Sequence, residues 1–328
     1  MQRRRLLLGT AAAAGVATLP ALAQTSRTWP QRPIRLLVGF PGGSTPDMAA
    51  RALADPLAAA LGQPVVVDNK AGAAGNIAAD QVAKSTDDHT LGVVINGNLT
   101  SAKMLNPRLP YDPGRDFAYL SLLTTAPLVL VTPTGQPSGA AFFAEARKQG
   151  NAWNYGSVGT GSVAHLGMEL LKSKMPGFQA EHIPFGGNPQ VITAILSGEI
   201  QLALMPPGVV LPHIQSGRLQ PIGLTSGRSL LAPAIAPLTD SGVRDYALEV
   251  WTALVGPAKL SAAARQRLGQ EVPRIMRTPE TRQRLFRQGW QAVGTAPEGL
   301  QQRVQQETEI MAAMIRVQRL QSESSPKS

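Results

Sequence analysis

The sequence contains no cysteine. This absence excludes disulfide bonds, catalysis by a thiolate and metal sites built on cysteine. The four histidines show neither the H-E-x-x-H pattern nor another spacing typical of a metal site. A chain of 328 residues is nevertheless long enough to bury the cores of two domains, so it can be stable after export without disulfides.

Common enzyme motifs are missing as well. No serine stands in a G-x-S-x-G turn, no Walker A lysine follows a glycine-rich loop, and no two carboxylates are marked as an acid–base pair. The segment GTGSVA at 159–164 matches a dinucleotide-binding pattern, but Glu181 starts the next strand instead of ending it, where the ribose would be bound. We therefore expect no enzymatic activity, no cofactor and no metal, with a periplasmic enzyme as the weakest alternative.

Acidic residues are fewer than basic ones, 21 against 31, which gives a formal net charge of +10 at pH 7. The basic residues are dispersed, apart from a denser series at 265–287, and they match no nucleic-acid-binding module. Aromatic residues make up 5% of the chain and do not interleave with the basic ones. This distribution favours the attraction of small anions and argues against nucleic acid as a partner.

Long apolar runs are absent beyond the N-terminus. Residues 1–23 combine Arg3, Arg4 and Arg5, an Ala-rich apolar stretch, and the cleavage pattern Ala21-Leu22-Ala23. They predict a signal peptide, exported by the Sec or the twin-arginine route, and a mature periplasmic protein that begins at Gln24. An uncleaved membrane anchor is the alternative. No later run approaches the ~20 apolar residues of a spanning helix.

The rest of the chain alternates strand-like and helix-like segments, which predicts an α/β fold with mostly parallel strands. Strands are expected at 34–40, 64–69, 90–96, 127–133 and 249–257, with helices such as 46–62 between them. The segments LVGFPGGSTPDMAAR and NYGSVGTGSVAHL both read as strand, glycine turn and helix. We infer two α/β domains, each presenting a helix N-terminus to a shared cleft.

The first turn has the composition of an anion-binding loop. Gly42 and Gly43 allow a sharp turn, Thr45 is a suitable N-cap, Pro46 fits the first helical position, and Asp47 complements the positive helix end. Free N–H groups at such a terminus attract anions. An ordinary loop with a well-capped helix is the alternative.

The second turn repeats this chemistry with three glycines, an N-cap serine and two further hydroxyl groups. The residues concerned are Gly156, Ser157, Gly159, Thr160, Gly161 and Ser162. His165 follows in the first turn of the helix, where it either faces a ligand or packs into the core; both interpretations stay open.

Five segments, taken together, resemble a known family. The first, from Trp29, reads WPQRPIRLLVGFPGGSTPDMAARALADPLAAALGQPVVVDNKAGAAGNIAADQVAKS. The others are LPYDPGRDFAYLSLL, NYGSVGTGSVAHLGMELLKS, HIPFGGNPQVITAILSGEIQLALMPPGVVLPHIQSGRLQPIGLTSGRS and WTALVGPAKLSAAARQRL. In order and spacing they resemble the Bug-type solute receptors of tripartite tricarboxylate transporters, from about residue 29 to residue 310.

The resemblance implies a two-domain periplasmic-binding-protein fold, a type II-like Venus flytrap with the ligand cleft between the domains. Domain I would comprise residues 24–126 and 252–328, and domain II residues 127–251, with hinges near 126–131 and 249–255. The implied function is to capture a small carboxylate-bearing metabolite, as a monomer, and deliver it to membrane transporter subunits. A sensory module that feeds a sensor kinase is the alternative.

The resemblance also implies the ligand-binding residues. The two loops and the facing strand ends would supply Phe40, Gly42, Gly43, Ser44, Thr45, Asp47, Asn98, Ser157, Gly159, Thr160, Gly161, Ser162, His165, Phe185, Gly186, Met205 and Pro207. The opening turn departs from the family pattern, since Ser44 replaces a common glycine and Pro46 replaces a Ser or Thr. Pro46 removes one donor, which would leave the N–H groups of Gly43, Ser44 and Asp47 to hold a carboxylate.

Overall fold

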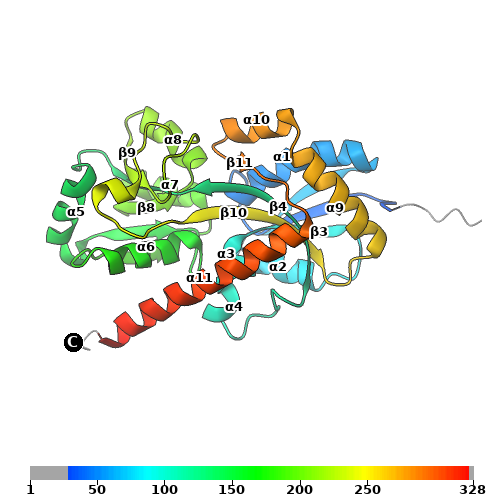
Figure 1. Ribbon diagram of the computed structural model, residues 1–328, viewed down its shortest axis with the longest axis horizontal. Helices are drawn as coiled ribbons and strands as arrows, with labels where there is room; N and C mark the ends of the chain where they lie inside the picture. Colours follow the sequence, from blue (N-terminus) through cyan, green and yellow to red (C-terminus); the bar gives the residue numbers. More distant parts are fainter. Residues whose placement is uncertain (1–28, 325–328) are drawn as a thin grey trace, which may run out of the picture.

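The computed structural model describes residues 29–324, so the predicted signal peptide at 1–23 lies outside the described residues. Two α/β lobes lie side by side along the long axis of the molecule (Figure 1). The first lobe is built on a six-stranded sheet with the order β11-β4-β10-β3-β1-β2, and the second on a five-stranded sheet with the order β7-β6-β8-β5-β9. Within the described residues, no helix is both long enough and apolar enough to cross a membrane.

The first lobe starts with strand–helix–strand units. Strand β1 pairs in parallel with β2 and with β3, because helices carry the chain back to the start of the sheet each time. Helix α1 buries Ala49, Leu53 and Leu57, spaced four apart on one face, and ends at Gly62 in the left-handed conformation. The elements up to the first crossing are β1 (Ile34–Val38), α1 (Thr45–Leu61), β2 (Val65–Asn69), η1 (Ala73–Gly75), α2 (Asn76–Ala83), β3 (Thr90–Ile95), α3 (Asn96–Leu99) and α4 (Ser101–Leu105).

Two segments cross between the lobes (Figure 1). Strand β4 (Phe117–Pro127) belongs to the first sheet and is separated only by Leu128 from β5 (Val129–Pro133) of the second. Strand β10 (Glu249–Pro257) returns to the first sheet and pairs antiparallel with β4 from Pro127↔Glu249 to Phe117↔Pro257. The hydroxyl of Thr225 accepts the N–H of Leu128 at 2.9 Å and donates to the carbonyl of Leu248 at 2.7 Å, which ties the two crossings together.

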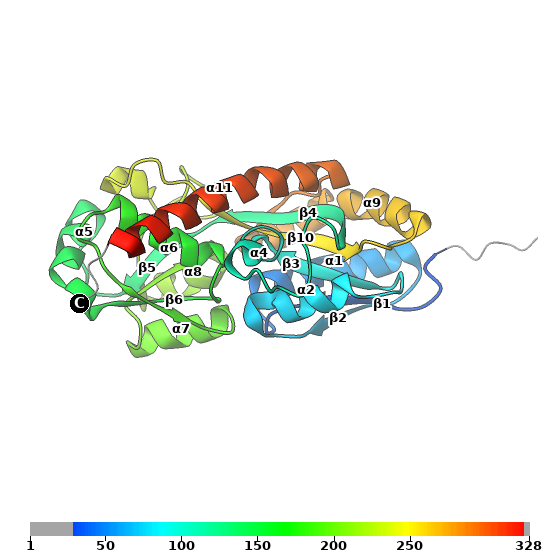
Figure 2. The same cartoon turned by 90° about the horizontal axis from the view of Figure 1, so that it is seen from below.

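The second lobe fills the chain between the crossings. Its elements after β5 are α5 (Gly139–Lys148), η2 (Gly150–Ala152), β6 (Asn154–Ser157), α6 (Val163–Lys174), β7 (Glu181–Pro184), α7 (Asn188–Ser197), β8 (Leu202–Met205), α8 (Pro207–Gln215), β9 (Leu219–Leu224) and η3 (Leu238–Ser241). The chain then completes the first lobe with α9 (Ala262–Met276), α10 (Pro279–Arg287) and β11 (Gln291–Ala292). The last helix, α11 (Pro297–Ser324), lies along both lobes and contacts β4 and α6 (Figure 2).

The expectation of mostly parallel strands is wrong, because both sheets are mixed. Strands β6, β7 and β8 pair in parallel, but β5 pairs antiparallel with β8 and β9, and β10 pairs antiparallel with β3 and β4. The reason is the double crossing: one strand leaves the first lobe and another returns, so they run in opposite directions. The sequence interpretation also omitted β4 altogether.

Candidate ligand-binding site

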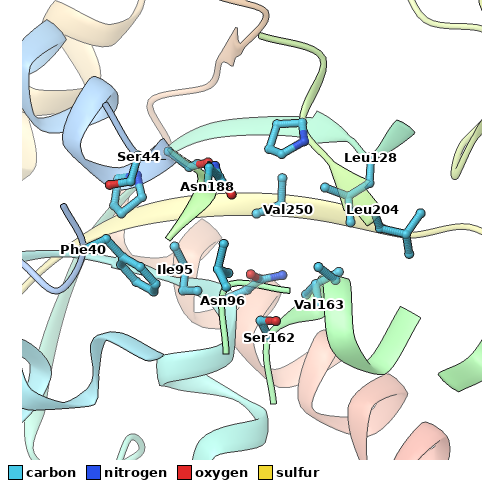
Figure 3. Close-up of a pocket in the computed structure, with 15 residues that line it drawn as sticks. Phe40, Ser44, Ile95, Asn96, Leu128, Ser162, Val163, Asn188, Leu204 and Val250 are labelled. Atoms are coloured by element: carbon cyan, nitrogen blue, oxygen red, sulfur yellow. The ribbon is translucent and has the colours of Figure 1, made fainter. Parts of the chain in front are cut away.

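A cavity lies between the lobes, beside both crossings. Figure 3 shows Phe40 and Ile95 of the first lobe on one side, Val163 and Leu204 of the second lobe on the other, and Val250 of β10 along the wall. The fifteen lining residues are Phe40, Ser44, Thr45, Pro46, Ile95, Asn96, Leu128, Val158, Ser162, Val163, Ala164, Asn188, Leu204, Pro206 and Val250.

The cavity wall is apolar with a few polar groups and, among the described residues, no charged side chain. The polar side chains are those of Ser44, Thr45, Asn96, Ser162 and Asn188. An anion in this cavity would therefore be held by hydroxyl, amide and backbone N–H groups rather than by a lysine or arginine. No cluster of His, Asp or Glu within residues 29–324 is arranged to hold a metal ion.

The N-terminus of α1 forms one end of the cavity. The helix starts at Thr45 with Ser44 as N-cap, so the expectation of Thr45 as N-cap is wrong by one residue. The Asp47 carboxylate explains the shift, because it accepts the N–H of Gly43 at 2.9 Å, and Gly43 takes a left-handed φ of 78° just before the cap. Pro46 consequently occupies the second helical position.

This register changes which donors a ligand would meet. The Gly43 N–H is taken by Asp47, and the Ser44 N–H donates to Pro41 O at 3.2 Å. The N–H groups of Thr45 and Asp47 have no acceptor in residues 29–324, and the Ser44 hydroxyl is buried without a partner among them. Of these three donors, the Ser44 hydroxyl and the Thr45 N–H belong to residues that line the cavity, so a carboxylate at this end would meet one hydroxyl and one backbone N–H group.

Asp47 supports the loop and does not line the cavity. Its carboxylate also accepts from Arg51 Nε at 3.0 Å and from Asn69 Nδ2 at 3.0 Å. Burial raises the pKa of Asp47, but the hydrogen bonds from Arg51, Gly43 and Asn69 outweigh that cost and hold the pKa below its usual value. The negative charge of Asp47 at the N-terminus of α1 is thus balanced by hydrogen bonds from these three residues.

The N-terminus of α6 faces the same cavity from the second lobe. Ser162 is its N-cap, and the Ser162 hydroxyl accepts the N–H of His165 at 3.3 Å. Val163 and Ala164, the first two helical residues, line the cavity, and the first N–H groups of a helix have no intrahelical acceptor. Two helix N-termini from different lobes therefore converge on one cavity, which favours an anionic occupant.

His165 and Ser157 lie behind the second loop. His165 Nδ1 accepts the Gly161 N–H at 3.2 Å, and its ring packs against His182 with centroids 4.1 Å apart. Ser157 Oγ is 2.7 Å from His182 Nε2. Burial, together with the neighbouring His165 and Lys172, lowers the pKa of His182 to about 3. Of the two interpretations of His165, the structure matches the packed one.

Direct contacts join the lobes around the cavity. Asn188 Nδ2 of the second lobe donates to Thr45 Oγ1 of the first at 3.1 Å. Ser101 Oγ of the first lobe donates to the Gly161 carbonyl of the second at 2.6 Å. Both bonds are buried, so the structure has the cleft closed.

Four of the expected ligand residues line this cavity: Phe40, Ser44, Thr45 and Ser162. Asn98, Thr160 and Gly161, again with Ser162, line a smaller adjoining cavity. The other expected residues line neither: Gly42, Gly43, Asp47, Ser157, Gly159, His165, Phe185, Gly186, Met205 and Pro207.

Alternation along a strand explains one of these placements. Met205 packs in the core of the second lobe, whereas Leu204 and Pro206 on either side of it line the cavity. Sequence reasoning did not name Asn96, although it stands directly after β3 in the NGN segment from which only Asn98 was selected. Its position at a strand end, where ligands bind in α/β folds, was the available signal.

The sequence is similar to known receptors over most of its length. Residues 49–320 match the family described as the tripartite tricarboxylate transporter family receptor. The chain is 34% identical to BugT of Bordetella pertussis, over 70% of this chain and 72% of that protein. It is 30% identical to a protein from the tcbD–tcbE intergenic region of a Pseudomonas species, over 94% of this chain and 92% of that protein.

Solved structures of periplasmic receptors are also similar to this chain over most of its length. Rpa4515 of R. palustris with adipate is 26% identical with a TM-score of 0.84, over 88% of this chain and 98% of that one. MatC of Rhodopseudomonas palustris with bound malate is 27% identical with a TM-score of 0.81, over 88% of this chain and 100% of that one. The two-domain periplasmic-binding-protein fold is thus confirmed. The chain belongs to the family of tripartite tricarboxylate transporter receptors, the Bug-type solute receptors that its motifs resemble.

Proposed function

We propose that this receptor works in the periplasm, captures a small carboxylate in the cavity between its lobes and delivers it to the membrane subunits of a tripartite tricarboxylate transporter. One observation carries the carboxylate assignment: the buried Ser44 hydroxyl has no partner among the described residues and lines a cavity on which the N-termini of α1 and α6 converge. The adipate and malate bound by the two similar receptors support the same ligand class.

We further propose that the lobes move as domains I and II, residues 24–126 with 252–328 and residues 127–251. Leu128 and Val250 lie on the two crossings and also line the cavity, so a rotation at these points would open and close it. The Thr225 hydroxyl, which binds both crossings, supports a common pivot.

Titration calorimetry on protein freed of copurified ligand by unfolding and refolding tests the ligand class. The panel comprises dicarboxylates, tricarboxylates, amino acids, nicotinate and aromatic acids. We expect at least one carboxylate to bind, and Ser44→Ala to weaken its affinity about tenfold or more, since a hydrogen bond to a charged group contributes roughly 1.5–3 kcal/mol. Ser138→Ala is the matched control, because Ser138 is also an N-cap serine whose hydroxyl makes no cap bond, on the exposed start of α5.

Failure of every carboxylate would contradict the ligand class. Delivery is tested in cells by uptake of the labelled carboxylate. Uptake should be lost on deletion of the receptor gene, restored by the wild type and restored only weakly by Ser44→Ala. Unchanged uptake after deletion would contradict the transport role.

A further inference from the structure

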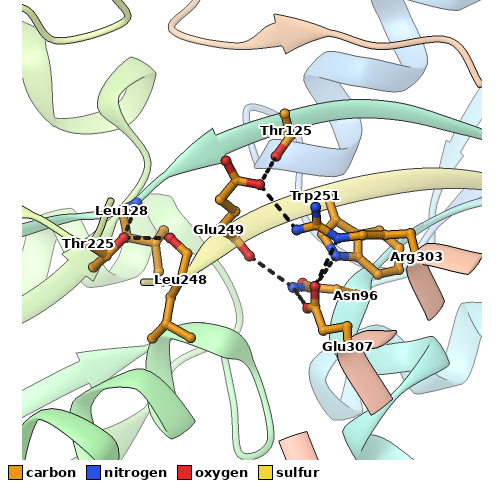
Figure 4. Close-up of polar contacts among 9 residues, drawn as sticks. All are labelled: Asn96, Thr125, Leu128, Thr225, Leu248, Glu249, Trp251, Arg303 and Glu307. Carbon is orange, nitrogen blue, oxygen red and sulfur yellow. Dashed lines mark hydrogen bonds and ion pairs between the residues drawn. The ribbon is translucent and has the colours of Figure 1, made fainter. Parts of the chain in front are cut away.

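Asn96 connects the cavity to a cluster of charged residues outside it. The residue follows β3, is fully buried and lines the cavity. Figure 4 shows its amide between the backbone of Glu249 on β10 and the carboxylate of Glu307 on α11. Thus one side chain touches the ligand space, a crossing strand and the long helix that spans both lobes.

The surroundings fix which way the amide points. Asn96 Nδ2 donates to Glu307 Oε1 at 2.6 Å and to the Glu249 carbonyl oxygen at 3.2 Å. A carbonyl oxygen can only accept a hydrogen bond, so the amide nitrogen must face it. The opposite orientation would place the Asn96 oxygen against that carbonyl.

The Glu307 carboxylate is itself held in place by donors. Trp251 Nε1 donates to Glu307 Oε2 at 2.6 Å, and Arg303 Nε donates to the same oxygen at 3.2 Å. Arg303 also donates to Glu249 Oε2 at 3.1 Å (Figure 4). The neighbours therefore leave Glu307 Oε1 as an acceptor for the Asn96 amide nitrogen.

The side-chain oxygen of Asn96 is an unpaired hydrogen-bond acceptor within this network. Oδ1 is buried and has no hydrogen-bond partner among the described residues. The Ser44 hydroxyl and the free N–H groups at the two helix N-termini can donate to a carboxylate, whereas Oδ1 can only accept. An ionised carboxylate has no proton to offer it, and among residues 29–324 no acidic side chain lines the cavity to balance a ligand ammonium group.

We propose that Asn96 is a specificity-determining residue that selects hydroxycarboxylates, with Oδ1 accepting a hydrogen bond from the ligand hydroxyl. Glu307 is a positioning residue that holds the amide in this orientation. This inference rests on the proposed carboxylate-binding function and narrows its substrate class. A ligand without the hydroxyl would leave Oδ1 buried and unpaired, which is the basis on which polar sites reject such analogues.

Matched acids that differ only by one hydroxyl group provide the test. Malate with succinate, 3-hydroxybutyrate with butyrate, and 2-hydroxyadipate with adipate are titrated into the refolded, ligand-free wild type. For the pair whose hydroxy member binds most tightly, we expect the deoxy acid to bind at least about tenfold more weakly. Mass spectrometry of the small molecule carried through purification should find an acid with a hydroxyl group.

Two variants test the assigned roles. Asn96→Ala should reduce the hydroxy-to-deoxy affinity ratio to within about threefold, because the acceptor is gone. Glu307→Gln should also lower the ratio, because a glutamine amide can donate to Asn96 Oδ1 and so favours the turned amide, although the Glu249 carbonyl opposes it. A purely structural role would weaken both acids alike and leave the ratio unchanged. Glu271→Gln, on α9 in a surface cluster with Arg267 and Arg274, is the matched control.

The outcomes separate this inference from the function on which it rests. Equal binding of hydroxy and deoxy acids by the wild type, or an unchanged ratio in Glu307→Gln, would overturn the role of Asn96 and leave the carboxylate receptor standing. The absence of binding by every acid would overturn the proposed function and this inference with it. If Asn96→Ala does not fold, the Glu307→Gln ratio still decides.

Discussion

At the scale of single residues, Ser44 and Asp47 show how a negative side chain can stand beside an anion site. Asp47 is buried in the first turn of α1, where its negative charge would repel a carboxylate ligand. Its oxygens are occupied by Gly43, Arg51 and Asn69, and the Arg51 guanidinium balances the charge. The Ser44 hydroxyl beside it keeps its bonding capacity for a ligand.

The histidines make stability depend on pH. All four have pKa values lowered by burial, and that of His182 is lowered to about 3. Below pH 6.5 an unfolded histidine binds a proton that folded His182 does not, so the free energy of unfolding falls as the pH falls from 6.5 towards 3. We expect the thermal midpoint to decrease steadily between pH 7 and pH 4.5, as measured by circular dichroism.

The variant His182→Gln should flatten this decrease, because it removes the largest of these shifts. Carboxylates with lowered pKa, Asp47 among them, lose their stabilising effect mainly below about pH 5, and they do so equally in the wild type and in both histidine variants. Burial raises the pKa of Glu307, so this residue makes the free energy of unfolding rise as the pH falls. It does so equally in every variant. His213→Gln, on α8, is the control and should change the slope less. An equal slope in His182→Gln and the wild type would show that His182 does not carry the effect.

At the scale of elements, the start of α8 fits closely against the loop between α10 and β11. A Cβ atom added to Gly208 of the second lobe would lie 1.7 Å from the Gln288 carbonyl of the first. A Cβ atom added to Gly289 on the facing loop would likewise lie 2.2 Å from Gly208 N. Because both partners are backbone, neither can move aside as a flexible side chain would. Glycine is therefore required here for the lobes to meet.

The variant Gly208→Ala should consequently weaken ligand affinity without unfolding either lobe. We expect the dissociation constant of the bound carboxylate to rise about fivefold or more, because overpacking of a close contact costs roughly 1–3 kcal/mol. Calorimetry measures the affinity, and circular dichroism checks the fold. Gly227→Ala is the matched control, since a Cβ there meets nothing within 4 Å. Normal affinity in Gly208→Ala would mean that this contact is not needed for binding.

The sequence predicted the elements whose signals are local. Segments such as IRLLVGF and PVVVDN lie within or around observed strands, because β-branched and apolar runs bounded by turns are typical of strands. Strand β4 was missed, because its assignment depends on pairing with β10 far along the chain. Asn98, the asparagine chosen from the NGN segment, lines the smaller adjoining cavity, and its amide is bonded to Ile95, Ala74 and Asn76. The position of Asn96 at a strand end could be read from the sequence, but its bond to Glu307 depends on where α11 lies.

At the scale of the whole molecule, the cavity exists only because the two lobes meet. The Thr45–Asn188 and Ser101–Gly161 bonds each join the first lobe to the second. The wall of the cavity combines residues from both lobes with Leu128 and Val250 from the two crossings. These buried bonds hold the lobes together beside the cavity, so we expect binding and release to require that they break and reform.

We therefore expect the ligand-free protein to be more open than the complex. Small-angle X-ray scattering should show that the radius of gyration decreases when a bound carboxylate is added, because rotation at the two crossings brings the lobes together. Asn188→Ala should raise the dissociation constant about two- to tenfold, since one hydrogen bond contributes roughly 0.5–1.5 kcal/mol. The radius of the saturated complex should stay the same, because the closed contacts elsewhere remain. A radius that does not change on binding would contradict the hinge, and it would require a ligand route through a rigid, closed molecule.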